Sequence, residues 1–157
     1  MIDTQIEKLH GLLESFDTVM LITMGGPAGC HARPMAIARL DENTDLWFFA
    51  SLDSATVREI EADPHVQIHG QGKRSTYVVL VGRATVVEDL AMIREAWKPT
   101  FKIWFPEGAD DPNIVLLHVK GEHAEYWDSN GVTALVTGST LEIKEGEQHA
   151  NVELSAG

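Results

Sequence analysis

A proline, Pro34, stands between Arg33 and Met35 inside a segment whose other residues favour a β-strand. Proline cannot donate a ladder hydrogen bond, so this position predicts a strand edge, a bulge, or a place where the backbone turns from its neighbour to a ligand. Taken alone, the pattern favours an edge strand. Ligand contact from that strand is the alternative that bears on function.

Residues 48–54 form a second stretch, in which an aromatic strand ends in hydroxyl-bearing residues just before a helix begins. Hydroxyl and backbone N–H groups at a helix N-terminus can hold a phosphate. The same residues are ordinary helix caps, and capping is the favoured interpretation. Thr56 and Glu59 have the spacing of a capping box, although Asp53 or Ser54 could equally supply the cap.

Aromatic residues gather in the second half of the chain, where they could wall a flat ring by stacking. Core packing explains them equally well. The set comprises Trp97, Phe101, Trp104, Phe105, Tyr126 and Trp127.

Metal and nucleophile chemistry lack support in the sequence. His65 and His69 lie on a predicted strand, where residues four apart are about 13 Å from each other and cannot share an ion. Cys30 is the only cysteine, and no histidine pairs legibly with it. No nucleophile elbow, P-loop or G-x-G-x-x-G motif is present, so acyl transfer, nucleotide hydrolysis and a Rossmann site have no sequence support.

The elements that must position these residues are mostly strands. Alternating or β-branched patterns predict six of them, over residues 18–24, 31–40, 46–50, 65–71, 76–87 and 114–127. Helical spacing predicts an opening helix that ends near Ser15, a short helix that Pro64 stops, and a third from Asp89 to Trp97. Gly82 marks a bulge or bend. Tight turns between most strands argue for a mainly β fold, a six-stranded antiparallel barrel flanked by helices.

The amino-acid composition limits the classes of molecule that the protein is expected to bind. Twelve basic residues against twenty-four acidic ones give a net charge of −12 over 157 residues, which disfavours nucleic acid and anionic membranes. No apolar run approaches the roughly 18 residues of a membrane span, and the first residues do not resemble a secretory signal, so we expect a cytoplasmic protein. We expect one domain over residues 1–136 and an acidic, loosely held tail over residues 137–157.

Together these stretches resemble the pyridoxamine 5′-phosphate oxidase-like split-barrel flavoproteins, in particular the general stress protein 26 branch. The resemblance runs from about Ile6 to Asp128. The stretches that carry it are Arg33-Pro34-Met35, residues 45–51, Arg58-Glu59-Ile60 with Asp63-Pro64, Trp97 with residues 102–108, Asp111-Pro112 and residues 124–128.

The resemblance implies an FMN-binding split barrel that forms a homodimer, with two flavin sites lined by both subunits. FAD is a possible substitute, and F420 or haem on the same barrel is a lesser alternative. No metal site is implied. The residues that would bind the cofactor are Arg33, Pro34, Met35, Phe49, Ala50, Ser51, Ser54, Thr56, Tyr77, Trp104 and Trp127. Among them Ser54 would hydrogen-bond the phosphate, and Trp104 or Trp127 would close the ring face from the partner subunit.

One departure from the family concerns the phosphate end. Related oxidases carry basic residues just after the phosphate-binding serine, where this chain has Ala55 and Thr56. The resemblance implies a small FMN-dependent oxidoreductase linked to general stress. It does not extend to pyridoxamine phosphate oxidation itself, because the C-terminal segment has too few basic residues to bind a second phosphate group. The alternative is a non-catalytic protein that carries flavin or senses stress.

Overall fold

The computed structural model describes residues 2–127, 132–137, 140–145 and 149–153, and the side chains of residues 6–127. The elements in chain order are α1 (Ile2–Glu14), β1 (Thr18–Gly26), β2 (Gly29–Ala36), β3 (Arg39–Leu40), β4 (Leu46–Ser51), α2 (Ala55–Ala62), β5 (His65–Gln71), β6 (Tyr77–Val87), α3 (Leu90–Ala96), the 3₁₀ helix η1 (Pro99–Ile103), β7 (Ile114–Trp127), β8 (Val132–Thr137), β9 (Thr140–Glu145) and β10 (His149–Glu153).

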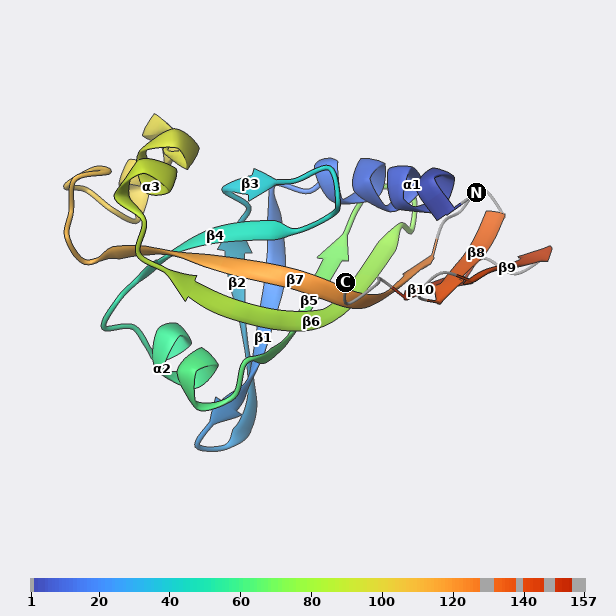
Figure 1. The fold of residues 1–157 in the computed structure, drawn as a ribbon, viewed down its shortest axis with the longest axis horizontal. Helices are drawn as coiled ribbons and strands as arrows, with labels where there is room; N and C mark the ends of the chain where they lie inside the picture. Colours follow the sequence, from blue (N-terminus) through green and yellow to red (C-terminus); the bar gives the residue numbers. More distant parts are fainter. Residues whose placement is uncertain (1, 128–131, 138–139, 146–148, 154–157) are drawn as a thin grey trace.

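Six strands make a curled antiparallel sheet in the order β2-β1-β5-β6-β7-β4. In Figure 1, α2 lies beyond one side of this sheet, while α1 and α3 lie toward the other. The predicted fold class, an antiparallel barrel with flanking helices, is confirmed. All six predicted strands exist. The second is shorter than predicted, because the chain leaves β1 after Ala36 and then forms the short β3 against β4.

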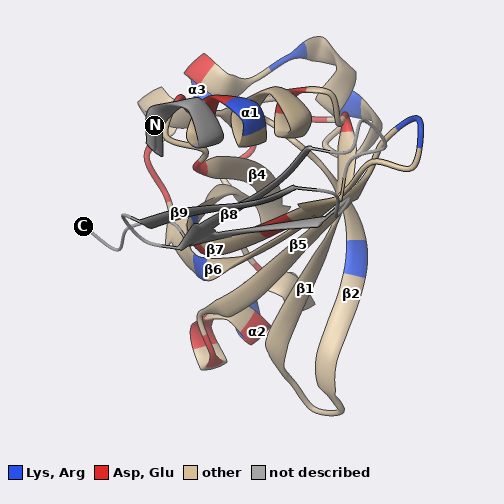
Figure 2. Ribbon diagram, turned by 90° about the vertical axis from the view of Figure 1, so that its right-hand side faces the viewer, with Lys and Arg blue, Asp and Glu red and all other residues tan. Residues whose placement is uncertain are grey.

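The barrel is split between β2 and β4. These two strands approach each other, but β2 pairs only with β1, and β4 pairs only with β3 and β7 in the described part of the chain. Pro34 therefore lies on an edge strand, as its missing donor predicts. Because β3 covers only Leu46 and Trp47, the remainder of β4 has no ladder on that side. Figure 2 shows β1 and β2 running together at the margin of the sheet.

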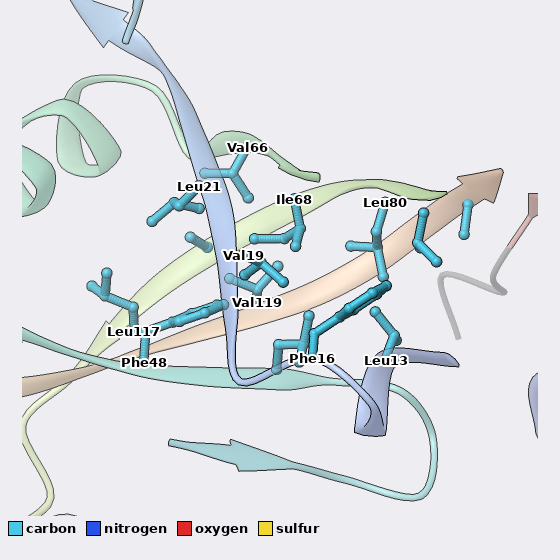
Figure 3. Packing of buried hydrophobic residues seen from close by; sticks show 14 of the residues in the cluster. Leu13, Phe16, Val19, Leu21, Phe48, Val66, Ile68, Leu80, Leu117 and Val119 are labelled. Carbon is cyan, nitrogen blue, oxygen red and sulfur yellow. The ribbon is translucent and has the colours of Figure 1, made fainter. Parts of the chain in front are cut away.

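The hydrophobic core fills the inside of the curl (Figure 3). Strand alternation directs Val19 and Leu21 of β1 inward, where they meet Phe48 of β4 and Leu117 of β7. Phe16, just after α1, packs in the same cluster, and its ring leaves no room for a side chain at Gly70. Apolar contacts inside the sheet therefore hold its curl. Side chains at the split between β2 and β4 remain available to contact a ligand.

The predicted bulge at Gly82 is confirmed by a register shift between Val81 and Gly82 in the β6–β7 ladder. A Cβ at Gly82 would lie 2.0 Å from the carbonyl oxygen of Lys120, so only glycine fits this approach. The C-terminal strand β10 pairs with β7 and lies within the segment predicted to be a tail. The domain boundary at residue 136 stays a prediction. Among the described residues, no helix has the length and apolar character needed to cross a bilayer.

Candidate functional site

A cavity of about 330 Å³ opens at the seam between β2 and β4. The N-terminus of α2 bounds one end of it, and η1 with the residues after it bounds the other. The lining residues are Thr18, Pro34, Met35, Ala36, Phe49, Ala50, Ser51, Ser54, Thr56, Phe101, Trp104 and Phe105. The split of the barrel thus produces a hollow of the size in which proteins bind small molecules.

Most of the residues predicted to bind a cofactor meet in this cavity. Those that line it are Pro34, Met35, Phe49, Ala50, Ser51, Ser54, Thr56 and Trp104. Arg33, Tyr77 and Trp127 do not line it. The exposed edge strand and the strand-to-helix junction, which lie apart in the sequence, therefore contribute to one site.

The α2 end of the cavity offers hydrogen-bond donors. Ser54 is the N-cap of α2, and its Oγ accepts a bond of 3.3 Å from the N–H of Val57. The first N–H groups of a helix have no intrahelical acceptor, so those of Ala55 and Thr56 remain for an anion. The two interpretations of Ser54 are therefore compatible, because its oxygen caps the helix while its O–H is left to donate into the cavity. The alternative cap, a box formed by Thr56 and Glu59, is absent.

The opposite end of the cavity is aromatic. The Phe49 ring is the centre of this group, with its centroid 5.0 Å from Phe101, 5.5 Å from Trp97 and 6.2 Å from Phe105. The Trp104 ring lies 6.4 Å from Phe101 and is 61% exposed. Phe49 and Phe101 are core residues, whereas Trp104 has a free face with which a planar ligand could stack.

Among the described residues, no ionisable side chain lines the cavity; its polar groups are hydroxyls, backbone amides and the indole N–H of Trp104. A molecule bound there would therefore contact no ionisable side chain of the described part of the chain. The described residues also contain no group of three or more side chains that could hold a metal ion.

Arg33 points instead into a buried cluster on the inner face of α2. Its Nη2 lies 2.6 Å from Oε2 of Glu59, a residue that is 6% exposed. Thr23 donates to the same carboxylate oxygen at 3.1 Å, and Nδ1 of His31 lies 2.9 Å from the other oxygen. Arg33 Nη1 is buried without a hydrogen-bond partner among the described residues. The predicted basic residue of the site is thus held by an acid 26 positions later.

The cluster also fixes how α2 packs on β1. A Cβ at Gly25 would lie 2.1 Å from the carbonyl oxygen of Glu59, and one at Gly26 would lie 2.9 Å from Oε1 of the same residue. The helix therefore rests directly on the backbone of the strand. Removing Arg33 alone would leave a buried carboxylate without its cation, which typically costs about 3–5 kcal/mol. An Arg33→Ala exchange would disturb α2 as well as any ligand contact.

Burial acts to raise the pKa of Glu59, but the hydrogen bonds from His31 and Thr23 and the charge of Arg33 outweigh it, so the pKa lies below its ordinary value. A depressed carboxyl pKa stabilises the fold above the unfolded-state value of about 4.5, and this stabilisation is lost as the pH falls through the folded value. We therefore expect the difference in unfolding free energy between the wild type and Glu59→Gln to shrink in acid.

Urea unfolding at about pH 7 and about pH 3 measures this difference. The matched control is Glu61→Gln, which changes an exposed residue of the same helix and should differ little from the wild type at either pH. A gap between the wild type and Glu59→Gln that stays constant over this range would contradict the prediction.

Tyr77 and Trp127 face each other across the β6–β7 ladder and line a second hollow of about 590 Å³. This hollow includes Met20 of β1 and His69 of β5, and Met20 and Tyr77 are 38% and 42% exposed. Thr18 lines both hollows, yet within one chain the two predicted aromatic residues belong to a different surface from the cavity at the seam.

A model of the family described as pyridoxamine 5′-phosphate oxidase like matches residues 4–149 of the chain. The chain belongs to this family. Two named relatives are similar to this chain, and the first carries the name of the branch predicted from the sequence. General stress protein 26 of Bacillus subtilis is 30% identical over 96 residues, which cover 59% of this chain and 66% of the relative. Protein bli-3 of Neurospora crassa is 24% identical over 156 residues, which cover 92% of this chain and 73% of the relative.

Solved structures share the fold. A protein related to general stress protein 26 from Clostridium acetobutylicum superposes with a TM-score of 0.71 at 18% identity, covering 91% of this chain and 95% of that one. The general stress FMN/FAD binding protein of Xanthomonas citri superposes with a TM-score of 0.67 at 31% identity, covering 78% of this chain and 87% of that one. The split barrel of the pyridoxamine 5′-phosphate oxidase-like family is thus the fold of this chain.

The sequence did not point to every residue of the site. Thr18 and Ala36 line the cavity but carry no distinctive chemistry, and their roles depend on the curl that brings β1 and β2 to the seam. Glu59 had a visible pattern, since it lies three residues after Thr56 on a helix, but that pattern suggested capping. The packing of α2 on the sheet shows that Glu59 instead faces the sheet, where it bonds Thr23 and Arg33.

Proposed function

We propose that this chain is an FMN-binding flavoprotein and acts as a small oxidoreductase. The observation that carries the proposal is the cavity at the seam, which has hydroxyl and N–H donors at one end and aromatic rings at the other. FMN has the same division, with a phosphate at one end and a flat ring system at the other. The Xanthomonas citri relative is described as a protein that binds FMN or FAD.

In this proposal Ser54, Thr56 and the first N–H groups of α2 hold the phosphate, since donors at a helix N-terminus favour an anion. Met35 and Ala50 contact the middle of the cofactor from the two edges of the seam, and Trp104 stacks on the ring. FAD would share the FMN half of these contacts. F420 and haem are the other cofactors to compare.

We also propose that a second copy of the chain completes the site. The hollow with Tyr77, Trp127 and the exposed Met20 is an apolar surface that a monomer would leave in water. A homodimer built on it would cover this surface and could bring Trp127 of one subunit toward the cavity of the other. The solution mass of the purified protein tests this arrangement.

When bound, FMN supplies the exchange of a hydride at its N5 atom, and the protein supplies orientation and a dry surrounding. The aromatic residues exclude water from the ring end, and the seam fixes the ring between two strand edges. Because no ionisable side chain that the structure describes lines the cavity, protons would be exchanged with the substrate or solvent. A role in general stress, suggested by the names of the relatives, and a cytoplasmic location belong to the same proposal.

The same neutral lining favours a second candidate, a flavin carrier or sensor with no catalytic activity of its own. Absorption spectra of the purified protein with added FMN, FAD, F420 and haem identify the cofactor. Adding NADH or NADPH without oxygen then separates the two functions: bleaching of the flavin that air restores supports the oxidoreductase, whereas a flavin that no reductant bleaches supports the carrier. A protein that binds none of the cofactors would refute both.

We expect Trp104→Ala to weaken FMN binding about tenfold, because a stacked aromatic ring contributes about 0.5–1.5 kcal/mol beyond the area that it buries. Titration of the flavin fluorescence measures the change. Ile103→Ala is the matched control, since this neighbour is 79% exposed and does not line the cavity. Equal affinities for Trp104→Ala and Ile103→Ala would remove Trp104 from the site.

A further inference from the structure

The cluster around Glu59 lies directly behind the phosphate end of the proposed flavin site. Along β2, Arg33 lies two residues before Met35, so alternation puts both on the same face, and Met35 lines the cavity. Along α2, Glu59 follows Thr56 by three residues, so the two share one face at about one helical turn, and Thr56 lines the cavity. Each member of the Arg33–Glu59 pair thus adjoins a residue of the cavity.

Together, Arg33 and Glu59 carry no net charge. The Nη2 of Arg33 and Oε2 of Glu59 lie 2.6 Å apart, and both side chains are largely buried, at 14% and 8% exposure. For a group about a helical turn away, the carboxylate offsets most of the guanidinium charge, so the pair presents a much weaker field to the cavity than a lone guanidinium would. The residues just after Ser54 are Ala55 and Thr56, which add no charge. Among the described residues that line this end of the cavity, a phosphate therefore meets only neutral donors. The cation of α2, Arg58, is exposed, and its Nη1 donates to the backbone carbonyl oxygen of Asp53.

We propose that Glu59 sets the flavin specificity of the site: by cancelling the charge of Arg33, it leaves a cavity that binds non-phosphorylated riboflavin nearly as well as FMN. This inference rests on the proposed flavin binding and adds the class of flavin. Arg33 and Glu59 are positioning residues in it, because they act on the phosphate through the field at α2 and do not contact it. A site of this kind exchanges its flavin, since no cation among the described lining residues anchors the phosphate.

The test is the ratio of the dissociation constants of riboflavin and FMN, measured at low ionic strength where charge effects are largest. A variant series changes the charge of the pair in steps while keeping hydrogen-bonding side chains. Glu59→Gln leaves a net charge of +1, the wild type and the double variant Arg33→Gln/Glu59→Gln leave zero, and Arg33→Gln leaves −1. The control Glu61→Gln removes an exposed charge from the same helix.

We expect a wild-type ratio below about ten, a ratio roughly tenfold higher in Glu59→Gln, and a ratio roughly tenfold lower in Arg33→Gln. The double variant and Glu61→Gln should match the wild type. If Arg33 bonded the phosphate directly through its Nη1, the double variant would instead lose phosphate preference as Arg33→Gln does, and the proposal would be overturned. A ratio that Glu59→Gln leaves unchanged in a folded protein would overturn it too.

Thermal unfolding identifies the variants that fold. If Arg33→Gln does not fold, the comparison of Glu59→Gln with the double variant is sufficient for the test. The proposed flavin binding fails by a different result: a wild type that binds neither riboflavin nor FMN would refute it. Binding of both flavins with a ratio that ignores the charge series refutes only the role of Glu59.

Discussion

Exchanging Ser54 for aspartate should lower the affinity for FMN by about two to three orders of magnitude while leaving α2 in place. Aspartate is as good an N-cap as serine, and Asp89 already caps α3 in this way, so the helix keeps its start. The new carboxylate removes a donor and repels the phosphate, which together cost about 3–4 kcal/mol in a partly buried site.

Riboflavin, which lacks the phosphate, should lose much less affinity for Ser54→Asp than FMN does. The matched control is Ser75→Asp, which adds the same charge to an exposed turn between β5 and β6, away from the cavity. Isothermal titration of the wild type and the two variants with each flavin gives the six affinities that are compared. Equal losses for FMN and riboflavin would mean that the phosphate lies elsewhere.

The second large effect concerns Gly25. An added Cβ there would lie 2.1 Å from the carbonyl oxygen of Glu59 and 3.1 Å from the amide nitrogen of Asp63. Both contacts are to backbone, so α2 must move away from β1. We expect Gly25→Ala to cost about 2–3 kcal/mol of unfolding free energy and to weaken flavin binding, because the N-terminus of α2 moves with the helix.

Gly11→Ala is the matched control for Gly25→Ala, since a Cβ at Gly11 meets nothing within 4 Å on α1. The same added methyl should there stabilise the protein by about 0.5–1 kcal/mol, because alanine restricts the unfolded chain and favours helix. Urea unfolding of the two variants measures both effects. A Gly25→Ala protein as stable as the wild type would show that α2 can shift on the sheet at little cost.

Local sequence patterns were sufficient for the strands and their edges. The β-branched run of β6, the bulge at Gly82 and the edge position of Pro34 all follow from rules that involve near neighbours, and the structure confirms each one. Alternation likewise separated the exposed His65 and His69 from the buried Val66 and Ile68, which lie between them in the sequence.

Long-range charge pairing lay beyond those patterns. Arg33 was predicted to contact a cofactor, yet its closest charged partner is Glu59, which follows by 26 positions and belongs to a helix packed on the far end of β1. Whether an acid on a short amphipathic helix faces water or the sheet depends on how the helix is seated. Gly25 and Gly26 control that seating, and their closeness to α2 cannot be read from spacing.

The unpaired seam between β2 and β4 makes ligand occupancy part of the folding equilibrium. Elsewhere in the barrel, adjacent strands are joined by backbone ladders, but the described residues of β2 and β4 form no ladder with each other, and the cavity lies between their edges. A molecule bound between Met35 and Ala50 would bridge the two strands. At a free ligand concentration of a hundred times its dissociation constant, it would add about 2.7 kcal/mol to the unfolding free energy. Loss of the ligand would therefore loosen the barrel first along its seam.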